Sequence, residues 1–188
     1  MVTKADLVFR RVVTLRDGAR VLLRPLLPED RQALLDLFLP VAYDERRFMR
    51  DDVNDPQVVE TWIEDLNYEK VFPLVAVMGE RIAGVTTLHF NSGAARHRCE
   101  LRIFLSREFR RRGLGNKLLQ SISEYASKRS MDMIEVQVVS EHVEIIKALQ
   151  RAGFELVCTL EDYFILPDGE LKDVALLVLR LRRSVDEF

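Results

Sequence analysis

The sequence has few of the residues on which disulfide frameworks and metal centres depend. It contains two cysteines and three histidines among 188 residues. Cys99 and Cys158 lack the spacing of zinc ligands, and we expect both to be reduced thiols in the core. His89 and His97 bracket a loop that contains neither a carboxylate nor a thiol. We therefore predict no metal site.

An excess of one charge and long apolar runs are also missing. Lys and Arg total 28 against 30 Asp and Glu, which gives a formal net charge of −2 at pH 7. We therefore expect no nucleic-acid-binding surface, and any anion site must be local. The longest apolar runs, such as residues 174–179, are too short to cross a membrane, and the N-terminal residues lack the apolar segment of a signal peptide. We expect a cytoplasmic protein with neither a membrane nor a nucleic-acid partner.

What the chain does have is a hydrophobic fraction of 48%, with no repeat, low-complexity tract or linker. We predict one domain over residues 1–188, with a core from about residue 10 to about residue 182. The elements indicate an α/β mixture with a mostly antiparallel sheet and one β–α–β crossover over residues 99–139. The predicted elements are a hairpin over 9–24 that turns at Asp17-Gly18, strands at 71–78, 81–90, 98–105, 133–139, 154–165 and 172–181, and helices at about 29–39, 56–66, 114–129 and 141–152.

The stretch FRRRGLGNKLL, residues 109–119, joins the strand at 98–105 to the helix that follows. Gly113 and Gly115 permit positive φ and close approach of a ligand to the backbone. The first N–H groups of a helix have no intrahelical acceptor, and three arginines precede them here. This combination favours a phosphate or pyrophosphate site, and the alternative is a solvated basic turn. Neither the Walker pattern nor the dinucleotide fingerprint fits the glycine spacing.

The R-x-x-G-x-G arrangement of Arg110, Gly113 and Gly115 resembles the acetyl-CoA pyrophosphate loop of the GNAT N-acetyltransferases. The expected elements also follow the order of that family: a strand, the loop, a helix, a strand, and a helix that ends at Gly153-Phe154. Residues 15–38 and the RRF at 46–48 are similar to the acetyltransferase domain of bacterial Pat-type protein lysine acetyltransferases. The resemblance covers nearly the whole chain.

The resemblance implies an α/β (α+β) GNAT fold, with a mixed, mostly antiparallel, V-shaped sheet of roughly seven strands flanked by roughly four helices. The sheet would be open between residues 99–105 and 133–139, where pantetheine would bind the backbone of Ile103 and Leu105. Loop amides at 111–116 would hold the pyrophosphate of acetyl-CoA, the co-substrate. The coenzyme-binding residues implied are Ile103, Phe104, Leu105, Arg110, Arg111, Arg112, Gly113, Leu114, Gly115 and Asn116.

Acetyl transfer to an amine requires that the ammonium lose a proton, and a lysine amine is mostly protonated at neutral pH. Glu100 lies on the strand before the loop, thirteen residues ahead of Gly113. The Pat-type subgroup carries its glutamate base at that spacing, so the resemblance implies that Glu100 is the general base. The alternative is that Glu100 only pairs with Arg98 or Arg102 along the strand. A backbone N–H near Ile103 would meet the oxyanion.

Many family members carry an Asn and a Tyr on the helix before the Gly-Phe pair, and the Tyr protonates the leaving thiolate. The positions eleven and four residues before Gly153 are here His142 and Leu149. His142 stands in for the Asn near pantetheine, or acts as an acid, or is a helix cap or a solvated side chain. Leu149 cannot donate a proton, so the CoA thiolate would leave unaided. A non-catalytic acyl-CoA-binding sensor is therefore an alternative function.

Residues 42–55 are charged and irregular, and in the GNAT fold this position borders the acceptor groove. The segment is either an acidic rim that attracts a cationic acceptor or a solvated loop, and Arg46 and Arg47 oppose the first interpretation. We expect a protein lysine as the acceptor, with a small amine as the competing choice and an interaction scaffold as the third possibility. The last strand pair offers an edge for a homodimer. The acids of the rim are Asp44, Glu45, Asp51 and Asp52.

Overall fold

The structure is a computed structural model that describes residues 8–181. The chain forms two compact units. The N-terminal unit contains residues up to Thr87 together with Ile103–Leu118. The C-terminal unit contains Leu88–Arg102 together with the residues from Leu119 onward. The prediction of a single domain over residues 1–188 stays a prediction.

Three elements run through both units, because each contains a boundary between them. They are strand β4 (Arg81–Phe90), strand β5 (Arg98–Leu105) and helix α5 (Leu114–Lys128). The glycine-arginine loop and the end of β5 therefore belong to the N-terminal unit, whereas the start of β5 belongs to the C-terminal unit.

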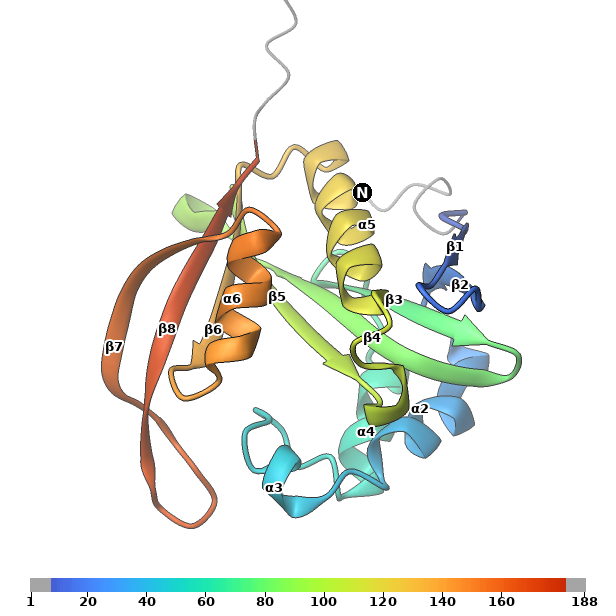
Figure 1. The fold of residues 1–188 in the computed structure, drawn as a ribbon, viewed down its shortest axis with the longest axis horizontal. Helices are drawn as coiled ribbons and strands as arrows, with labels where there is room; N and C mark the ends of the chain where they lie inside the picture. The colour runs from blue at the N-terminus through green and yellow to red at the C-terminus, as the bar shows by residue number, and fades with distance from the viewer. Residues whose placement is uncertain (1–7, 182–188) are drawn as a thin grey trace, which may run out of the picture. The chain divides into compact units, whose positions relative to one another are not determined.

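The described strands of the N-terminal unit follow the order β1-β2-β3-β4-β5. Strands β1 and β2, drawn in blue in Figure 1, form an antiparallel pair with Thr14 opposite Arg20. Gly18 in their turn has a φ of 85°. This confirms the hairpin predicted at Asp17-Gly18. The bounds are β1 (Arg11–Thr14), β2 (Arg20–Pro25) and β3 (Val71–Met78).

Helices α2 (Arg31–Phe38) and α4 (Pro56–Glu64) of the N-terminal unit bury their apolar faces in one cluster that also includes residues of β3 and β4. Phe38 of α2 stacks on Phe104 of β5 with 5.1 Å between ring centroids, and Trp62 of α4 meets the edge of Phe38 at 5.3 Å. This aromatic group fixes the face of β5 on which Phe104 lies. The helices are η1 (Pro28–Asp30), α2 (Arg31–Phe38), α3 (Tyr43–Arg46), α4 (Pro56–Glu64) and η3 (Arg107–Phe109).

The described strands of the C-terminal unit follow the order β4-β5-β6-β8-β7. Strand β5 pairs with β6 in parallel, as predicted for the crossover through α5, and β8 pairs antiparallel with both β6 and β7. Figure 1 shows β7 and β8 as a long orange and red pair. The bounds are η2 (Gly93–Ala95), β6 (Met133–Val139), α6 (Val143–Arg151), β7 (Glu155–Ile165) and β8 (Leu171–Arg180).

Side chains alternate across the parallel pair of the C-terminal unit. Cys99 lies opposite Ile134, and both side chains are fully buried. The next pair, Glu100 opposite Glu135, points to the other face of the sheet and is only partly buried. The candidate base therefore lies on the open face, while its neighbour Cys99 belongs to the core.

One of the two cysteine predictions is wrong. Cys99 is buried, as predicted, and burial raises the pKa of its thiol to about 12. Cys158 is exposed. It lies on β7, which pairs only with β8 among the described strands, and β7 leaves nearly all of its side chains accessible. An apolar residue on an edge strand of this kind has no second layer to cover it.

The described residues contain eight strands and five α-helices, one more of each than the rough prediction. The extra helix is the short α3, in a segment predicted to be irregular. Across residues 8–181 no helix combines the length and apolarity needed to cross a membrane, and no cluster of three or more His, Cys, Asp and Glu side chains is placed to hold a metal ion. The V shape of the sheet concerns how the units are arranged, and it stays a prediction.

Candidate active site

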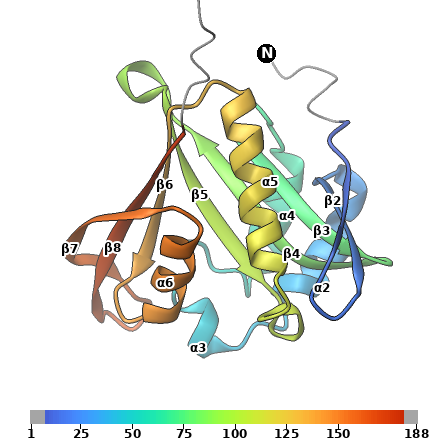
Figure 2. The same ribbon diagram turned by 45° about the horizontal axis from the view of Figure 1, so that its top comes forward.

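The glycine-arginine loop turns sharply before α5 begins. Arg111 and Gly113 both occupy the left-handed region, with φ of 61° and 89°. Leu114 is the first residue of α5 and is fully buried, so the helix start is anchored in the core. Figure 2 shows α5 leaving this turn. The N–H groups of the first helical turn and the positive end of its dipole are therefore presented at the loop.

The backbone conformation at Gly113 favours glycine. Its φ is one that other residues adopt only with strain. A Cβ atom there would also lie 3.4 Å from Cγ of Arg16, on the β1–β2 hairpin. A bare backbone beside a cation and a helix N-terminus fits a diphosphate, because phosphate oxygens approach main-chain nitrogens closely only where no side chain intervenes.

A second glycine, Gly84 on β4, was not singled out in the sequence. A Cβ atom there would lie 2.5 Å from Cδ2 of Leu105 and 2.9 Å from the carbonyl oxygen of Phe104. Only glycine therefore allows β4 to approach the end of β5 this closely. An isolated glycine inside a predicted strand is the signal that identifies such a position.

Ion pairs fix the loop at both of its ends. Arg110 forms a bidentate pair with Glu45 of α3 at 2.8 and 2.7 Å, and its Nε donates to the carbonyl of Leu105 at 3.0 Å. Arg112 donates to the Asp17 carboxylate of the β1–β2 hairpin at 2.5 Å. The positive charges of these two arginines are thus matched by acids, and their side chains position the loop.

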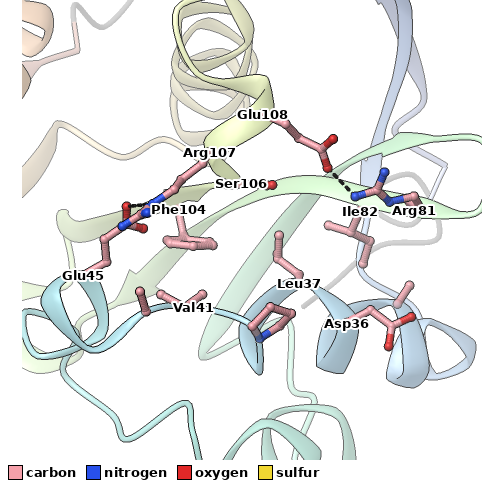
Figure 3. Close-up of a pocket in the computed structure, with 13 residues that line it drawn as sticks. Asp36, Leu37, Val41, Glu45, Arg81, Ile82, Phe104, Ser106, Arg107 and Glu108 are labelled. Atoms are coloured by element: carbon pink, nitrogen blue, oxygen red, sulfur yellow. Dashed lines mark hydrogen bonds and ion pairs between the residues drawn. The ribbon is translucent and has the colours of Figure 1, made fainter.

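A cavity of about 420 Å³ lies in the N-terminal unit on the Phe104 side of β5. Figure 3 shows Phe104, Leu37 and Val41 lining it, with two ion pairs at opposite sides. One pair joins Arg107 to Glu45, and the other joins Arg81 to Glu108. The lining also includes Asp36, so three carboxylates face two guanidinium groups. Glu45 and its neighbour Asp44, two of the four acids of the predicted rim, are both paired with Arg107.

The pairing of Glu45 predicts a pH dependence of stability. Hydrogen bonds from Arg110, and then from Arg107, lower the pKa of Glu45 to about 2 from its usual 4.5. Since the folded-state pKa is the lower one, this stabilisation is complete above about pH 5 and is lost as the pH falls from there to about 2. We expect Glu45→Gln to lower the unfolding free energy at pH 7 by about 1–2 kcal/mol, because the pair is only partly shielded from solvent.

Denaturant unfolding at pH 7, 4 and 2.5 measures this effect. The difference between wild type and Glu45→Gln should shrink as the pH falls. Glu80→Gln, which changes an exposed residue of the β3–β4 turn, is the matched control and should unfold like the wild type at every pH. A difference that persists unchanged at pH 2.5 would contradict the assignment to the ion pair.

Glu100 and His142 belong to the C-terminal unit, whereas the predicted coenzyme residues from Ile103 to Asn116 all belong to the N-terminal unit. Glu100 accepts a hydrogen bond from Nε of Arg102 at 3.1 Å, and its side chain is 23% exposed. Arg98 pairs with Glu135 at 2.7 Å instead. Glu100 is therefore paired, as one interpretation expected, but it remains accessible on the open face.

Glu135 was not identified in the sequence, although it stands directly opposite Glu100 on β6. Two carboxylates on adjacent positions of parallel strands repel each other unless cations intervene, and here each has its own arginine. The register of β5 and β6 decides this juxtaposition. Strand patterns alone do not give that register.

His142 directly precedes α6, and Leu149 lies within it. His142 is the residue before its first turn, it is partly buried, and its side chain makes no capping hydrogen bond. Its carbonyl accepts from the N–H groups of Ile145 and Ile146. Leu149 is 2% exposed and packs in the core. The position predicted for a tyrosine acid is thus filled by a buried aliphatic side chain.

The chain matches the family model described as acetyltransferase (GNAT) domain over residues 28–167. Solved structures of GNAT proteins share its fold. The GNAT domain of S. lividans PAT has a TM-score of 0.74 at 18% identity, with 96% of this chain and 100% of that chain covered. A ribosomal-protein-alanine N-acetyltransferase from Brucella melitensis has a TM-score of 0.74 at 22% identity, with 85% and 99% covered.

A chimera of spermidine N-acetyltransferase from Vibrio cholerae and hSSAT has a TM-score of 0.72 at 18% identity, with 85% of this chain and 95% of that chain covered. These identities are low, so the likeness shows the fold alone. The comparison with curated proteins found no match.

Proposed function

Because this chain belongs to the GNAT acetyltransferase family, we propose that it transfers the acetyl group of acetyl-CoA to a primary amine, with a protein lysine as the acceptor. The observation that carries the proposal is the loop before α5. Two left-handed residues, Arg111 and Gly113, form the turn that leads into the N-terminus of α5, and Gly113 contributes no side chain of its own there. GNAT acetyltransferases use acetyl-CoA, whose diphosphate this loop suits.

We place the pantetheine arm along the end of β5. The ladder between β5 and β6 uses Arg98, Cys99 and Glu100, and β5 extends beyond these residues to Leu105. Main-chain groups of Ile103 and Leu105 are the proposed partners of the pantetheine amides. Gly84 lets β4 approach Leu105 closely and so helps to hold the end of β5 in place.

Direct transfer is the mechanism that these residues favour. Glu100 accepts a proton from the acceptor ammonium, and the amine nitrogen then attacks the acetyl carbon. The carbon–sulfur bond breaks as the new amide forms, the electron pair leaves on the CoA sulfur, and the nitrogen releases its second proton to solvent water. Leu149 provides no proton for that thiolate, so it departs as the anion. Cys99 is not an acyl carrier, because it is buried and the pKa of its thiol is raised to about 12.

The Pat-type subgroup is the one we favour, because Glu100 stands at the spacing of its base. A small-molecule amine is the second candidate. Proteins of this fold include enzymes whose names specify a ribosomal-protein alanine and spermidine, so the fold suits both kinds of acceptor. A non-catalytic acyl-CoA-binding module is the third candidate, and the apolar Leu149 at the acid position is the observation that favours it.

Release of free CoA thiol distinguishes these candidates. With acetyl-CoA present, we expect thiol release above the hydrolysis background when lysine peptides are added, and less with polyamines, amino acids or aminoglycosides. Faster thiol release with a small amine would support acetyltransferase activity but would reject a protein lysine as the acceptor. Calorimetric binding of acetyl-CoA without transfer to any member of the panel would support the sensor instead.

We further propose that β7 is the contact edge of a homodimer. Its side chains Val157 and Ile165 are 55% and 71% exposed, and its outer backbone groups face no other described strand. Sedimentation analysis tests this. A monomer at micromolar concentration would contradict it.

A further inference from the structure

The β1–β2 hairpin is attached to the glycine-arginine loop by three contacts. The N–H of Arg16 donates to the carbonyl of Arg112 at 3.0 Å. The Asp17 carboxylate accepts from Arg112 at 2.5 Å. The aliphatic part of the Arg16 side chain lies beside Gly113, where the Cγ, Nε and Cδ atoms would stand 3.4, 3.6 and 3.8 Å from an added Cβ. A residue far away in the sequence thus lies directly against the turn that precedes α5.

The charges around the loop divide into two groups. Arg110 and Arg112 are bound to Glu45 and Asp17, respectively. Arg16 and Arg111 are exposed and form no ion pair within residues 8–181. Arg110 and Arg112 therefore position the loop. The charges of Arg111 on the loop and Arg16 on the hairpin are not compensated by an acid among the described residues.

We propose that Arg16 binds a phosphate group of the coenzyme, so that the β1–β2 hairpin forms part of the coenzyme site. The inference rests on the proposed function, since it takes CoA as the ligand. A guanidinium presents paired N–H donors that match two phosphate oxygens, and this bidentate contact is stronger than a contact with an ammonium. Asp17 keeps Arg112 occupied and holds the hairpin in place, which leaves Arg16 as the hairpin's contribution to the anion.

The phosphate that Arg16 contacts belongs either to the diphosphate or to the 3′-phosphate of CoA. Calorimetry with CoA, dephospho-CoA and pantetheine separates these sources. We expect Arg16→Gln to weaken CoA binding about 10-fold or more, because a charge-assisted hydrogen bond is lost. If the loss persists with dephospho-CoA, Arg16 contacts the diphosphate. If it disappears, Arg16 contacts the 3′-phosphate.

Arg20→Gln is the matched control, because Arg20 is an exposed arginine on the same hairpin. It should bind CoA like the wild type. Arg16→Lys should fall between wild type and Arg16→Gln, which a purely structural role of Arg16 would not produce. Pantetheine carries no phosphate, so its binding should be the same for all variants.

Three results would overturn the inference. Equal CoA affinity of Arg16→Gln and wild type would remove Arg16 from the site while leaving the proposed function intact. An equal loss of affinity for CoA and pantetheine would show that the substitution disturbs the fold of the site. Failure of the wild type itself to bind CoA would reject the proposed function together with this inference.

Discussion

Replacement of Glu100 by glutamine should lower kcat for acetyl transfer by about 10²- to 10³-fold, the usual effect of removing a general base. Glutamine keeps the size and hydrogen-bonding capacity of the side chain, so Arg102 retains a partner. The affinity for CoA should not change, because the predicted coenzyme residues begin at Ile103, beyond Glu100 on β5, and continue in the loop. Steady-state kinetics with a lysine peptide, together with calorimetry for CoA, measures both quantities.

The pH profile provides a readout that a structural defect would not give. An acceptor amine loses its proton to water as the pH approaches about 10, and the need for a protein base then disappears. The gap between wild type and Glu100→Gln should therefore narrow as the pH rises. A constant gap would indicate that Glu100 acts by some means other than proton removal.

Glu135→Gln is the matched control, because Glu135 stands opposite Glu100 and is likewise paired with an arginine. We expect kcat of this variant to fall by less than about 10-fold, because the substitution changes the local charge but does not remove the base. A larger loss of kcat in Glu135→Gln than in Glu100→Gln would indicate that the base is Glu135 of β6. Normal turnover of Glu100→Gln would eliminate its proposed role.

The sequence was informative where the signals were local. The turn at Asp17-Gly18, the parallel crossover through α5 and the position of the loop before that helix follow from neighbouring residues. Strand alternation and helix periodicity are also local, so most element bounds were predicted closely. These features supply the scaffold of the site and its glycine positions.

The contacts that hold the loop could not be predicted in the same way. The pair of Arg112 with Asp17 joins residues 95 positions apart, and the pair of Arg110 with Glu45 joins residues 65 positions apart. Three consecutive arginines look alike in the sequence. Only the tertiary structure shows that two of them are paired with acids, and that a fourth arginine, Arg16, lies beside Gly113.

The solvent accessibility of single strand residues also could not be predicted from the sequence. Cys99 and Cys158 both occupy predicted strands, yet one is buried and the other exposed. Cys99 lies on the covered face of β5, whereas β7, which pairs only with β8 among the described strands, leaves nearly all of its side chains accessible on both faces. The order of strands in a sheet depends on long-range pairing, and local propensity does not encode it.

The substitution Gly113→Glu should weaken CoA binding by ~100-fold or more, since it combines strain, a steric obstacle and a negative charge at an anion site. The φ of 89° disfavours any side chain, by about 1–2 kcal/mol. The new Cβ would also contact Arg16, and the carboxylate would compete with phosphate for its guanidinium. Calorimetry with CoA measures the loss, and thermal unfolding records any change in stability.

Gly169→Glu separates these effects, because Gly169 has a φ of 85° in the turn before β8 and an added Cβ would contact nothing within 4 Å. Both variants carry the same new charge and similar backbone strain, so both should lose similar stability. Only Gly113→Glu should lose CoA affinity, because only Gly113 lies at the start of α5. Retention of wild-type affinity by Gly113→Glu would mean that the coenzyme diphosphate does not bind at this loop, and the assignment of the loop as the coenzyme site would fail with it.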